Sequence, residues 1–450
     1  MFDVGIIGAG PAGYTAAIRA AQYGLSVVIF EKQDFGGTCL NRGCIPTKAL
    51  LHSAEVLSTL KQAGKFGINA ENISFDYKKV FERKNEVVGK IRKSLTQLVK
   101  SYGIEIINAN AVIRDNSKIE ANDSIYECKN IIIASGSKPT KLTFEGNYDD
   151  SFLLNSDEIL ELDNLPKEIL VVGSGAIGIE WTRILSEFGV QVTLIELANQ
   201  LIPLADMDVS SRVERILKRK RVKFYTNTTI TKIEEKIVTL SNGIVLSPEK
   251  ILIATGRAAL LGETTTHTKI ETEKFIKTTN NFQTNIENIY AIGDVNGKSM
   301  LAHSAMHQAI EVIECIKNSN KCHFDSTKVP SVIYGHPEIA WVGKTEQQLI
   351  KENVEYKKSL FPIAALGKAY ADDNIEGFIK ILATEDQILG VHIISPEASA
   401  LVQQILIAIE SNTSLEDLSK IIFAHPTYSE GILEAILGLN NLAIHIPQTK

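Results

Sequence analysis

The chain is poor in cysteine, with only five in 450 residues. Two of them, Cys39 and Cys44, lie close together in the stretch GGTCLNRGCIPTK at 36–48. A zinc site needs about four ligands, and no other cysteine or histidine pair in the chain has ligand spacing. We therefore predict no metal centre. We expect the remaining cysteines to be buried or idle thiols: Cys128, Cys315 and Cys322.

Long apolar runs are also missing. No segment approaches the ~20 apolar residues that are needed to span a bilayer. The chain begins MFDVGIIGAG, without a basic leader or a small-residue cleavage site. We therefore expect a cytoplasmic protein. Structural disulfides are rare in that compartment, where a close cysteine pair is more often catalytic or metal-binding.

The chain has little excess charge of either sign. It holds 47 Lys and Arg against 53 Asp and Glu, a formal net charge of -6. The basic residues are scattered rather than gathered into a stripe, which argues against a nucleic-acid partner. The run KRKR at 218–221 ends an amphipathic segment, and we interpret it as a solvated helix end. The length predicts two to four domains.

The N-terminal segment has the pattern of a dinucleotide-binding unit. An apolar run leads into Gly8, Gly10 and Gly13 in G-x-G-x-x-G spacing, and a predicted helix and a strand ending in Glu31 follow. The glycines let the backbone turn tightly and approach a pyrophosphate at the helix N-terminus. Glu31, 18 residues after Gly13, is placed to accept hydrogen bonds from a ribose.

The same pattern recurs about 165 residues later. Gly173, Gly175 and Gly178 follow a buried strand, and the next strand ends in Glu196 after the same interval of 18 residues. The chain therefore contains two dinucleotide domains. None of the residues 197–200 is basic, so nothing there neutralises a 2′-phosphate, and this favours NAD over NADP.

A third segment, NIYAIGDV at 288–295, predicts a strand that delivers Asp294 at its C-terminal end. Ligands of doubly wound sheets lie at such strand ends; the alternative for Asp294 is a solvated turn residue. Two dinucleotide sites in one chain favour one bound flavin and one exchanging nicotinamide, between which a hydride can pass.

The cysteine pair has two further interpretations, a structural disulfide and a redox pair. Residues at i and i+5 of a regular helix are rotated apart, whereas a disulfide needs Cα atoms within about 7 Å. Pro46 cannot donate to the carbonyl of Arg42, so the first helical turn can be distorted, and the neighbouring glycines add freedom. A position near a helix N-terminus also stabilises a thiolate. The arrangement suits a disulfide that exchanges.

Oxidation of a dithiol also needs a base, and histidine titrates in the useful pH range. Two His-Pro segments offer one: His425 with Glu430, and His336 with Glu338. The residues alone do not show which of the two pairs supplies the base. The alternative for each histidine is a structural role, with its hydrogen bonds made within the fold.

Five motifs in order resemble the class I pyridine nucleotide–disulfide oxidoreductases, within them the branch that oxidises dihydrolipoyl groups. They are GGTCLNRGCIPTK at 36–48, GSGAIGIE at 173–180, IYAIGDV at 289–295, VPSVIYGHPEIAWVGKTE at 329–346 and AHPTYSE at 424–430. The resemblance covers essentially the whole chain. It implies an α/β fold with two Rossmann-like dinucleotide-binding domains plus a C-terminal α+β dimerisation domain. The implied bounds are 1–145 for an FAD-binding domain, 146–256 for an NAD-binding domain, 257–326 for a central segment returning to the FAD domain and 327–450 for the dimerisation domain.

The resemblance also implies an activity, the oxidation of protein-bound dihydrolipoyl groups to lipoyl with reduction of NAD+ to NADH. The enzyme would be a homodimer serving 2-oxo acid dehydrogenase or glycine-cleavage complexes. Its partners would be lipoyl domains of an acyltransferase or of the glycine-cleavage carrier protein, with no nucleic acid and no membrane. A related NAD(P)H-dependent disulfide reductase and a non-catalytic flavin-bearing scaffold subunit stay as alternatives.

By this resemblance a redox disulfide joins Cys39, which exchanges with substrate, to Cys44, the sulfur beside the flavin. His425 would be the acid/base acting on the disulfide of the other subunit, with Glu430 orienting it, and His336 would be structural. The residues expected to contact a tightly bound, non-covalent FAD are Gly8, Gly10, Gly13, Glu31, Gly37, Thr38, Lys48, Asp294 and Ala302. Those expected to contact NAD+ as an exchanging substrate are Gly173, Gly175, Gly178, Glu180, Glu196 and Gly256.

The chain departs from the family pattern at several positions. Arg42 replaces the more usual valine between the cysteines, and Gly335 stands where threonine is common before His-Pro. The usual Arg-Pro-Asn is absent after Gly256 and Arg257, which leaves the NAD contacts of residues 255–262 open. No role for Arg42 follows from the residues alone.

Overall fold

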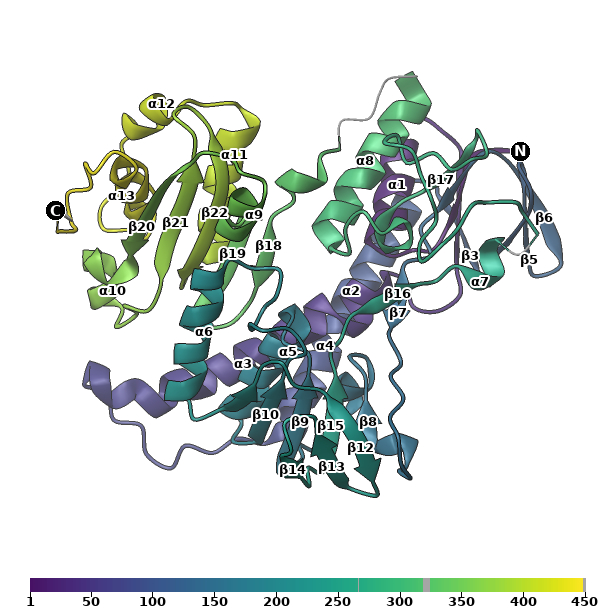
Figure 1. Ribbon diagram of the computed structural model, residues 1–450. Helices are drawn as coiled ribbons and strands as arrows, with labels where there is room; N and C mark the ends of the chain where they lie inside the picture. The colour runs from purple at the N-terminus through teal and green to yellow at the C-terminus, as the bar shows by residue number, and fades with distance from the viewer. Residues whose placement is uncertain (266, 319–323, 448–450) are drawn as a thin grey trace.

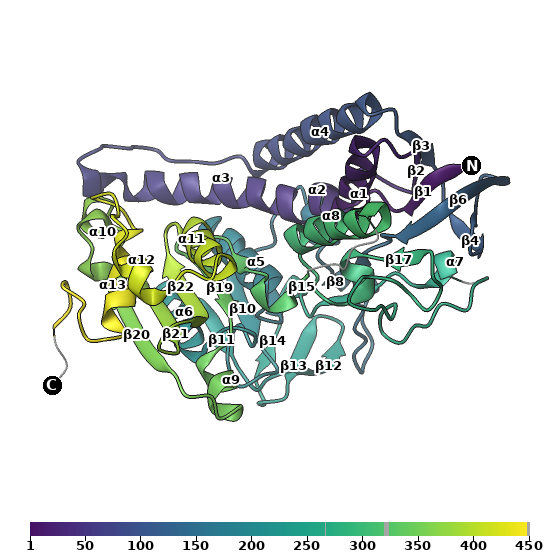
Figure 2. The same ribbon diagram turned by 90° about the horizontal axis from the view of Figure 1, so that it is seen from above.

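The computed structural model describes residues 1–265, 267–318 and 324–447. Figure 1 shows three bodies, with the N-terminal sheet at the upper right, a second sheet at the bottom and a third at the upper left. The long helix α3 (Cys44–Gln62) runs from the first body to the third, as Figure 2 shows from above. Among the described residues, no helix combines the length and the apolar character that crossing a membrane requires.

The N-terminal body is a doubly wound sheet. Its strands lie in the order β3-β2-β1-β6-β5-β4, and β17 pairs with β6 in parallel, so a segment near residue 290 returns to the first sheet. Helix α1 (Pro11–Gln22) packs against α8 (Ala302–Asn318) on one face. The strands are β1 (Phe2–Ile7), β2 (Val27–Glu31), β3 (Glu105–Asn108), β4 (Val112–Asp115), β5 (Lys118–Ala121), β6 (Ser124–Ile133) and β17 (Ile289–Ala291).

The second body repeats this architecture. Its parallel strands have the order β11-β10-β9-β15-β8, and α5 (Ala176–Glu187) and α6 (Met207–Arg219) lie along the sheet. Strand β9 reads EILVV, and such a continuous apolar run is expected for a strand buried on both faces. The strands are β8 (Leu153–Leu154), β9 (Glu168–Val172), β10 (Gln191–Ile195), β11 (Lys223–Tyr225) and β15 (Lys250–Ile253), with a small sheet of β12 (Ile230–Glu234), β13 (Ile237–Leu240) and β14 (Val245–Leu246).

The first two bodies are joined by two crossings of the chain. Strands β7 (Ser137–Pro139) and β16 (Arg257–Ala259) pair antiparallel at the crossing, with Arg257 opposite Pro139. Helix α4 (Tyr77–Ser101) packs on α3 and also contacts α2 (Gly37–Arg42).

The third body is an antiparallel sheet with helices on it. The strand order is β18-β19-β22-β21-β20, and α11 (Ala398–Glu410) and α13 (Glu430–Gly438) cover it. Its core is separate, but Phe378 and Ile339 belong to the core of the second body, so these two bodies are packed together. The strands are β18 (Ser331–Ile333), β19 (Glu338–Gly343), β20 (Lys357–Pro362), β21 (Phe378–Ala383) and β22 (Ile388–Ser395); the short helices are α9 (Glu346–Lys351), α10 (Gly367–Ala371) and α12 (Leu415–Ser419).

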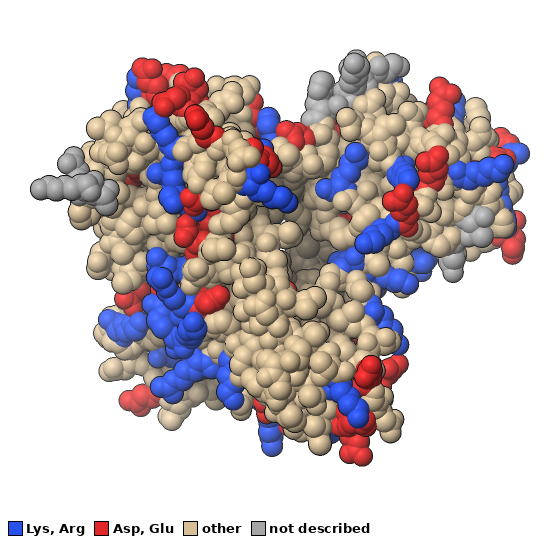
Figure 3. Space-filling view, viewed as in Figure 1, with Lys and Arg blue, Asp and Glu red and all other residues tan. Residues whose placement is uncertain are grey.

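The predicted fold class is confirmed, with two doubly wound units and a C-terminal α+β unit. The basic run at 218–221 ends α6 and is exposed, and Figure 3 shows basic side chains gathered over that helix. Cys128 is a buried free thiol, as predicted. The prediction of a free thiol is wrong for Cys315, which is disulfide-bonded, because an isolated cysteine gives no sign of its pairing. Cys322 lies outside the described residues.

Candidate active site

The two close cysteines lie on either side of a helix break. Cys39 is in α2 (Gly37–Arg42), and Cys44 is the first residue of α3. Gly43 between them has φ -153° and ψ -110°, which is not helical. A Cβ at Gly43 would lie 3.0 Å from the carbonyl oxygen of Thr38, so the two short segments approach closely there. The break brings the two thiols into hydrogen-bonding contact, which a continuous helix would not allow.

The two thiols differ in their acidity. The hydrogen bond from Cys39 lowers the pKa of Cys44 to about 7; burial opposes this change and the charge of Lys48 supports it. The same hydrogen bond, with burial, raises the pKa of Cys39 well above its usual range. Both residues are half-buried and free in this structure. The hydrogen bond from Cys39 and the nearby charge of Lys48 therefore favour negative charge on Cys44 when the pair is reduced.

This asymmetry predicts the thiolate titration of the reduced protein. We expect the ultraviolet absorbance of a single thiolate to appear with a midpoint below the usual thiol range, because the hydrogen bond from Cys39 lowers the pKa of Cys44. Cys44→Ser should remove that thiolate, and Cys39→Ser should move its midpoint upward because the hydrogen-bond donor is lost. Cys128→Ser is the matched control, since that thiol is buried elsewhere. A wild-type titration in which no thiolate forms until the usual thiol range would contradict the asymmetry.

Lys48 and Glu180 form an ion pair beside the cysteines. The Lys48 Nζ lies 2.9 Å from both carboxylate oxygens of Glu180, which is 4% exposed. The backbone N–H of Tyr334 donates to the same carboxylate at 3.0 Å, and Lys48 lies over the Tyr334 ring. These three residues come from α3, α5 and the strand end after β18, so all three bodies meet at this point.

Arg183 explains the glycine at position 335. Its buried guanidinium donates to the carbonyls of Tyr334 at 3.2 Å and Pro337 at 2.8 Å. A Cβ at Gly335, where φ is +137°, would lie 2.3 Å from the Arg183 Nη1. The arginine therefore occupies the space that a side chain at 335 would need. Sequence reasoning did not find Arg183, because its partners are backbone carbonyls far along the chain.

The first glycine motif forms a cradle of the shape that a dinucleotide needs. Gly8 has φ +101°, and a Cβ at Gly13 would lie 1.8 Å from the Gly8 carbonyl oxygen. A Cβ at Gly37 would lie 2.5 Å from the Cα of Gly10, so α2 meets the motif at backbone distance. Gly10 caps α1 without a side chain, which leaves backbone N–H groups for pyrophosphate oxygens. Glu31 accepts from the N–H of Ala9 at 2.8 Å, at the strand end where a ribose would lie.

The second motif has the same geometry. Gly173 has φ +97°, and a Cβ at Gly178 would lie 1.9 Å from the Gly173 carbonyl oxygen. Gly175 caps α5 without a side chain. Glu196 accepts from the N–H and the hydroxyl of Ser174, both at 2.8 Å. The residues of both motifs thus fit dinucleotides. Gly256, with φ +110°, follows β15 at the junction of the two bodies.

Asp294 belongs to a polar chain that reaches α2. The Ser137 hydroxyl donates to Asp294 at 2.5 Å, and the Arg257 Nε donates to that hydroxyl at 2.8 Å. The Arg257 Nη2 is 3.5 Å from the hydroxyl of Thr38. Ala302 opens α8 on the other side. Sequence reasoning missed Ser137 and treated Arg257 only as part of an open loop.

Arg42 ties the cysteine helix α2 to two other segments. Its Nη2 donates to the Gln33 side chain at 2.6 Å, and its guanidinium is 3.7 Å from both Asp34 and Asp157. Asp157 in turn lies 3.8 Å from Arg257. Arg42 therefore fixes α2 against the loop after β2 and against the second body, a role that its position between the cysteines did not reveal.

The two His-Pro segments differ in geometry. The Nδ1 of His425 is 2.8 Å from Glu430, whose other oxygen accepts from the N–H of Thr427 at 2.8 Å. The Nε2 of His336 instead meets Asn374 at 2.6 Å, and Glu338 accepts from a backbone N–H. Of these two segments, only the one with His425 and Glu430 pairs the histidine ring with a carboxylate, an arrangement that holds an imidazole in one tautomer and orientation.

His425 lies at the surface of its own chain. Its side chain is 75% exposed, and none of the contacts between described residues joins it to Cys39 or Cys44. A hollow of about 260 Å³ lies on the same unit, lined mostly by apolar residues of α11, α12 and α13 and of the segment before His425, including Ile405, Leu418, Phe423 and Ile432. The neighbouring Ile422 is 95% exposed. A surface of this kind is typical of an interface between proteins.

The fold and this site define a flavoprotein disulfide oxidoreductase, with two dinucleotide units, a close cysteine pair and a separate C-terminal unit. The chain matches the family described as pyridine nucleotide-disulphide oxidoreductase over residues 2–309 and the dimerisation domain of that family over residues 329–436. The chain belongs to this family, so the predicted family is confirmed.

Several curated relatives span nearly the whole chain. Dihydrolipoyl dehydrogenase of Bacillus subtilis is 38% identical over 471 aligned residues, which cover 99% of each chain. The dihydrolipoyl dehydrogenase of Chlamydia pneumoniae is 36% identical and covers 99% of this chain and 98% of its own. The crystal structure of LpdA from Mycobacterium tuberculosis superposes with a TM-score of 0.89 over 96% of this chain and 98% of that chain, at 22% identity, which shows the shared fold.

Proposed function

We propose that this oxidoreductase oxidises protein-bound dihydrolipoyl groups to lipoyl groups and reduces NAD+ to NADH. The observation that carries the proposal is the asymmetric cysteine pair at the junction of two dinucleotide cradles. Full-length relatives with the name dihydrolipoyl dehydrogenase support the choice of substrate. We expect the enzyme to act in the cytoplasm.

The two cradles are assigned to two cofactors. The first would hold FAD through Gly8, Gly10, Gly13, Glu31, Gly37, Thr38, Lys48, Asp294 and Ala302. When bound, FAD supplies the redox chemistry that takes an electron pair from a thiolate and delivers it as a hydride to NAD+. The second would hold NAD+ through Gly173, Gly175, Gly178, Glu180, Glu196 and Gly256. The carboxylate of Glu196, with no basic residue after it, favours NAD+ over NADP+.

The cysteines perform a thiol–disulfide exchange. His425 of the partner subunit removes a proton from one substrate thiol, and the thiolate attacks Cys39 of the oxidised pair. The Cys39–Cys44 bond breaks, and Cys44 leaves as a thiolate with the charge of Lys48 nearby. The second substrate thiol, also deprotonated, displaces Cys39 and closes the lipoyl disulfide. The substrate thus loses two electrons, and these reduce the Cys39–Cys44 disulfide to the dithiol.

The geometry of His425 supports a homodimer. Within one chain the His425–Glu430 pair is exposed and does not contact the cysteines. The match to a dimerisation domain at residues 329–436 and the apolar hollow beside the pair fit a second copy at this surface. The expected partners beyond the dimer are lipoyl domains of an acyltransferase or of the glycine-cleavage carrier protein.

Two other functions have less support. An NADPH-dependent disulfide reductase needs a site for the 2′-phosphate, where this chain has Glu196 and no adjacent basic residue. A non-catalytic scaffold would not need Cys39, Cys44, His425 and Glu430 in the arrangement found here.

A steady-state assay tests the proposed function. The purified flavoprotein should reduce NAD+ with free dihydrolipoamide as the donor, with much lower activity for NADP+. Glutathione disulfide with NADPH is the control substrate pair and should give little turnover. Turnover only with NADPH and glutathione disulfide would contradict the proposal.

A further inference from the structure

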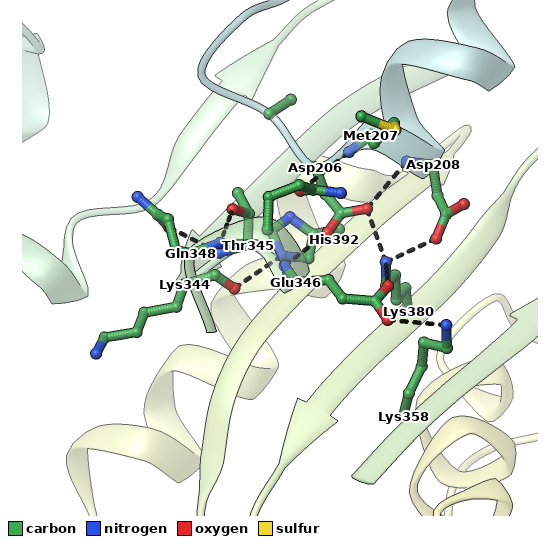
Figure 4. A network of polar contacts seen from close by, with 12 residues as sticks. Asp206, Met207, Asp208, Lys344, Thr345, Glu346, Gln348, Lys358, Lys380 and His392 are labelled. Carbon is green, nitrogen blue, oxygen red and sulfur yellow. Dashed lines mark hydrogen bonds and ion pairs between the residues drawn. The ribbon is translucent and has the colours of Figure 1, made fainter. Parts of the chain in front are cut away.

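A buried lysine far from the cysteines is surrounded by three carboxylates. Lys380, in β21, is 0% exposed. Its Nζ lies 2.7 Å from Asp206, 2.6 Å from Asp208 and 2.6 Å from Glu346, as Figure 4 shows. An ammonium has three donor hydrogens, so each carboxylate takes one. We call these four residues the Lys380 cluster.

Two carboxylates of the cluster, Asp206 and Glu346, also have partners outside the lysine. Asp206 caps α6 by accepting from the N–H of Asp208 at 3.0 Å, and its second oxygen accepts from the N–H of Glu346 at 2.9 Å. Burial opposes ionisation of Glu346, but hydrogen bonds from Lys380, Lys358 and Tyr356 lower its pKa to about 2. A buried charge persists only when its partners are complete. The cluster is therefore a fixed arrangement rather than a chance surface contact.

The cluster joins the second dinucleotide unit to the C-terminal unit. Asp206 and Asp208 stand at the start of α6, while Glu346 opens α9 and Lys380 lies in the central part of the antiparallel sheet. In Figure 4 the blue-green helix start and the yellow-green strands meet at the lysine. A second contact, Arg212 to Glu376 at 2.9 Å, holds α6 to the same unit one turn further along.

The loop between Glu196 and Asp206 leads from the cluster back to the dinucleotide cradle. Leu201 and Ile202 in this loop are buried, and the N–H of Ile202 donates to the Ser174 hydroxyl at 3.0 Å. That hydroxyl donates to Glu196, the carboxylate expected to meet the ribose. A continuous set of contacts thus runs from Asp206 through the loop to Ser174, which follows the first glycine of the second motif. A shift of the α6 start would be transmitted to this end of the cradle.

Stability alone does not explain a charged cluster here. Hydrophobic side chains of similar volume usually stabilise a buried position as well as an ion pair does, whereas ion pairs fix geometry. We propose that Lys380 is a positioning residue for the pyridine nucleotide: its cluster fixes the loop 196–206 against the C-terminal unit and so sets the affinity of the second dinucleotide cradle. This inference rests on the proposed function only in taking NAD+ as the ligand of that cradle.

The test is the dissociation constant of NAD+ measured by calorimetry on the oxidised, flavin-containing enzyme. We expect Lys380→Met to raise it roughly three- to thirtyfold, the range found for residues that couple through packed networks. Asp208→Asn removes one negative charge from the cluster, at a half-exposed side chain. This variant should also raise the NAD+ dissociation constant, but by a smaller factor than Lys380→Met. It provides the test if Lys380→Met folds poorly.

Controls separate positioning from general damage. Lys358→Met is the matched control, because Lys358 contacts only Glu346 of the cluster and is 48% exposed; it should leave NAD+ affinity nearly unchanged. Flavin content and the Cys44 titration should be the same in all variants. Unchanged NAD+ affinity in both Lys380→Met and Asp208→Asn would overturn the inference. A different outcome would count against the proposed function alone: a wild-type enzyme that binds NAD+ but does not oxidise dihydrolipoamide.

Discussion

Replacement of Cys44 by serine should abolish NAD+-linked dihydrolipoamide oxidation while the protein keeps its yellow flavin. The serine hydroxyl cannot form the disulfide that takes up the two substrate electrons, nor the thiolate that passes them on. The close glycine contacts that shape the flavin cradle do not involve Cys44. Steady-state turnover and the visible absorption spectrum of the purified variant measure the two properties separately.

Cys128→Ser is the matched control for this substitution. Cys128 is also a free thiol, but it is buried in β6, within the core of the first sheet. Its replacement should leave turnover close to that of the wild type. Dihydrolipoamide oxidation that survives in Cys44→Ser at a normal rate would show that the electrons do not pass through the cysteine pair.

Replacement of His425 by glutamine should lower turnover by roughly 10²- to 10⁴-fold, the usual contribution of a general base. Glutamine keeps the size and one hydrogen bond to Glu430, but it cannot accept a proton. Because protonated substrate thiols then have no base, we expect the loss to be smaller at high pH, where the thiols ionise without help. A pH–rate profile of the variant against the wild type measures this difference.

His336→Gln is the control for the base. His336 has the same His-Pro context, but its ring meets the Asn374 amide and no carboxylate orients it. Its replacement should change turnover little. A near-normal rate in His425→Gln together with a large loss in His336→Gln would reverse the assignment.

The glycine motifs allowed both dinucleotide units to be predicted from the sequence. Positions such as Gly13 and Gly178 admit no Cβ because the carbonyl of the first motif glycine lies under 2 Å from where it would be. Because this steric constraint acts between residues that are close in sequence, it can be recognised from the spacing of the glycines. The same holds for the Cys39–Cys44 stretch, although the helix breaks at Gly43 rather than at Pro46.

Contacts between distant segments could not be predicted in this way. Lys380 and Asp206 are separated by 174 positions, and neither has a neighbour in sequence that indicates a buried ion pair. In the sequence, Arg42 is a departure from the family pattern with no evident role. Its contacts with Asp34 and Asp157 are visible only in the structure. Gly335 likewise depends on Arg183, a residue of another unit. These features depend on how the units pack, which a single sequence does not encode locally.

The choice between the two histidines shows what the sequence leaves open and what the structure adds. Composition left His425 and His336 equivalent, since each has a proline after it and a glutamate close by. The geometry separates them, because α13 begins at Glu430 and directs that carboxylate at His425, whereas Glu338 lies in β19 and binds a backbone N–H.

A hybrid dimer tests most directly the central claim, that the cysteines of one subunit and His425 of the other form one redox site. Cys44→Ser and His425→Gln subunits with different affinity tags would be co-expressed, and the heterodimer purified through both tags. The heterodimer then has one complete site and one doubly altered site. We predict about half of the wild-type dihydrolipoamide:NAD+ activity per dimer, since a two-fold dimer carries two equivalent sites. Activity no higher than that of the two parent homodimers would contradict the claim.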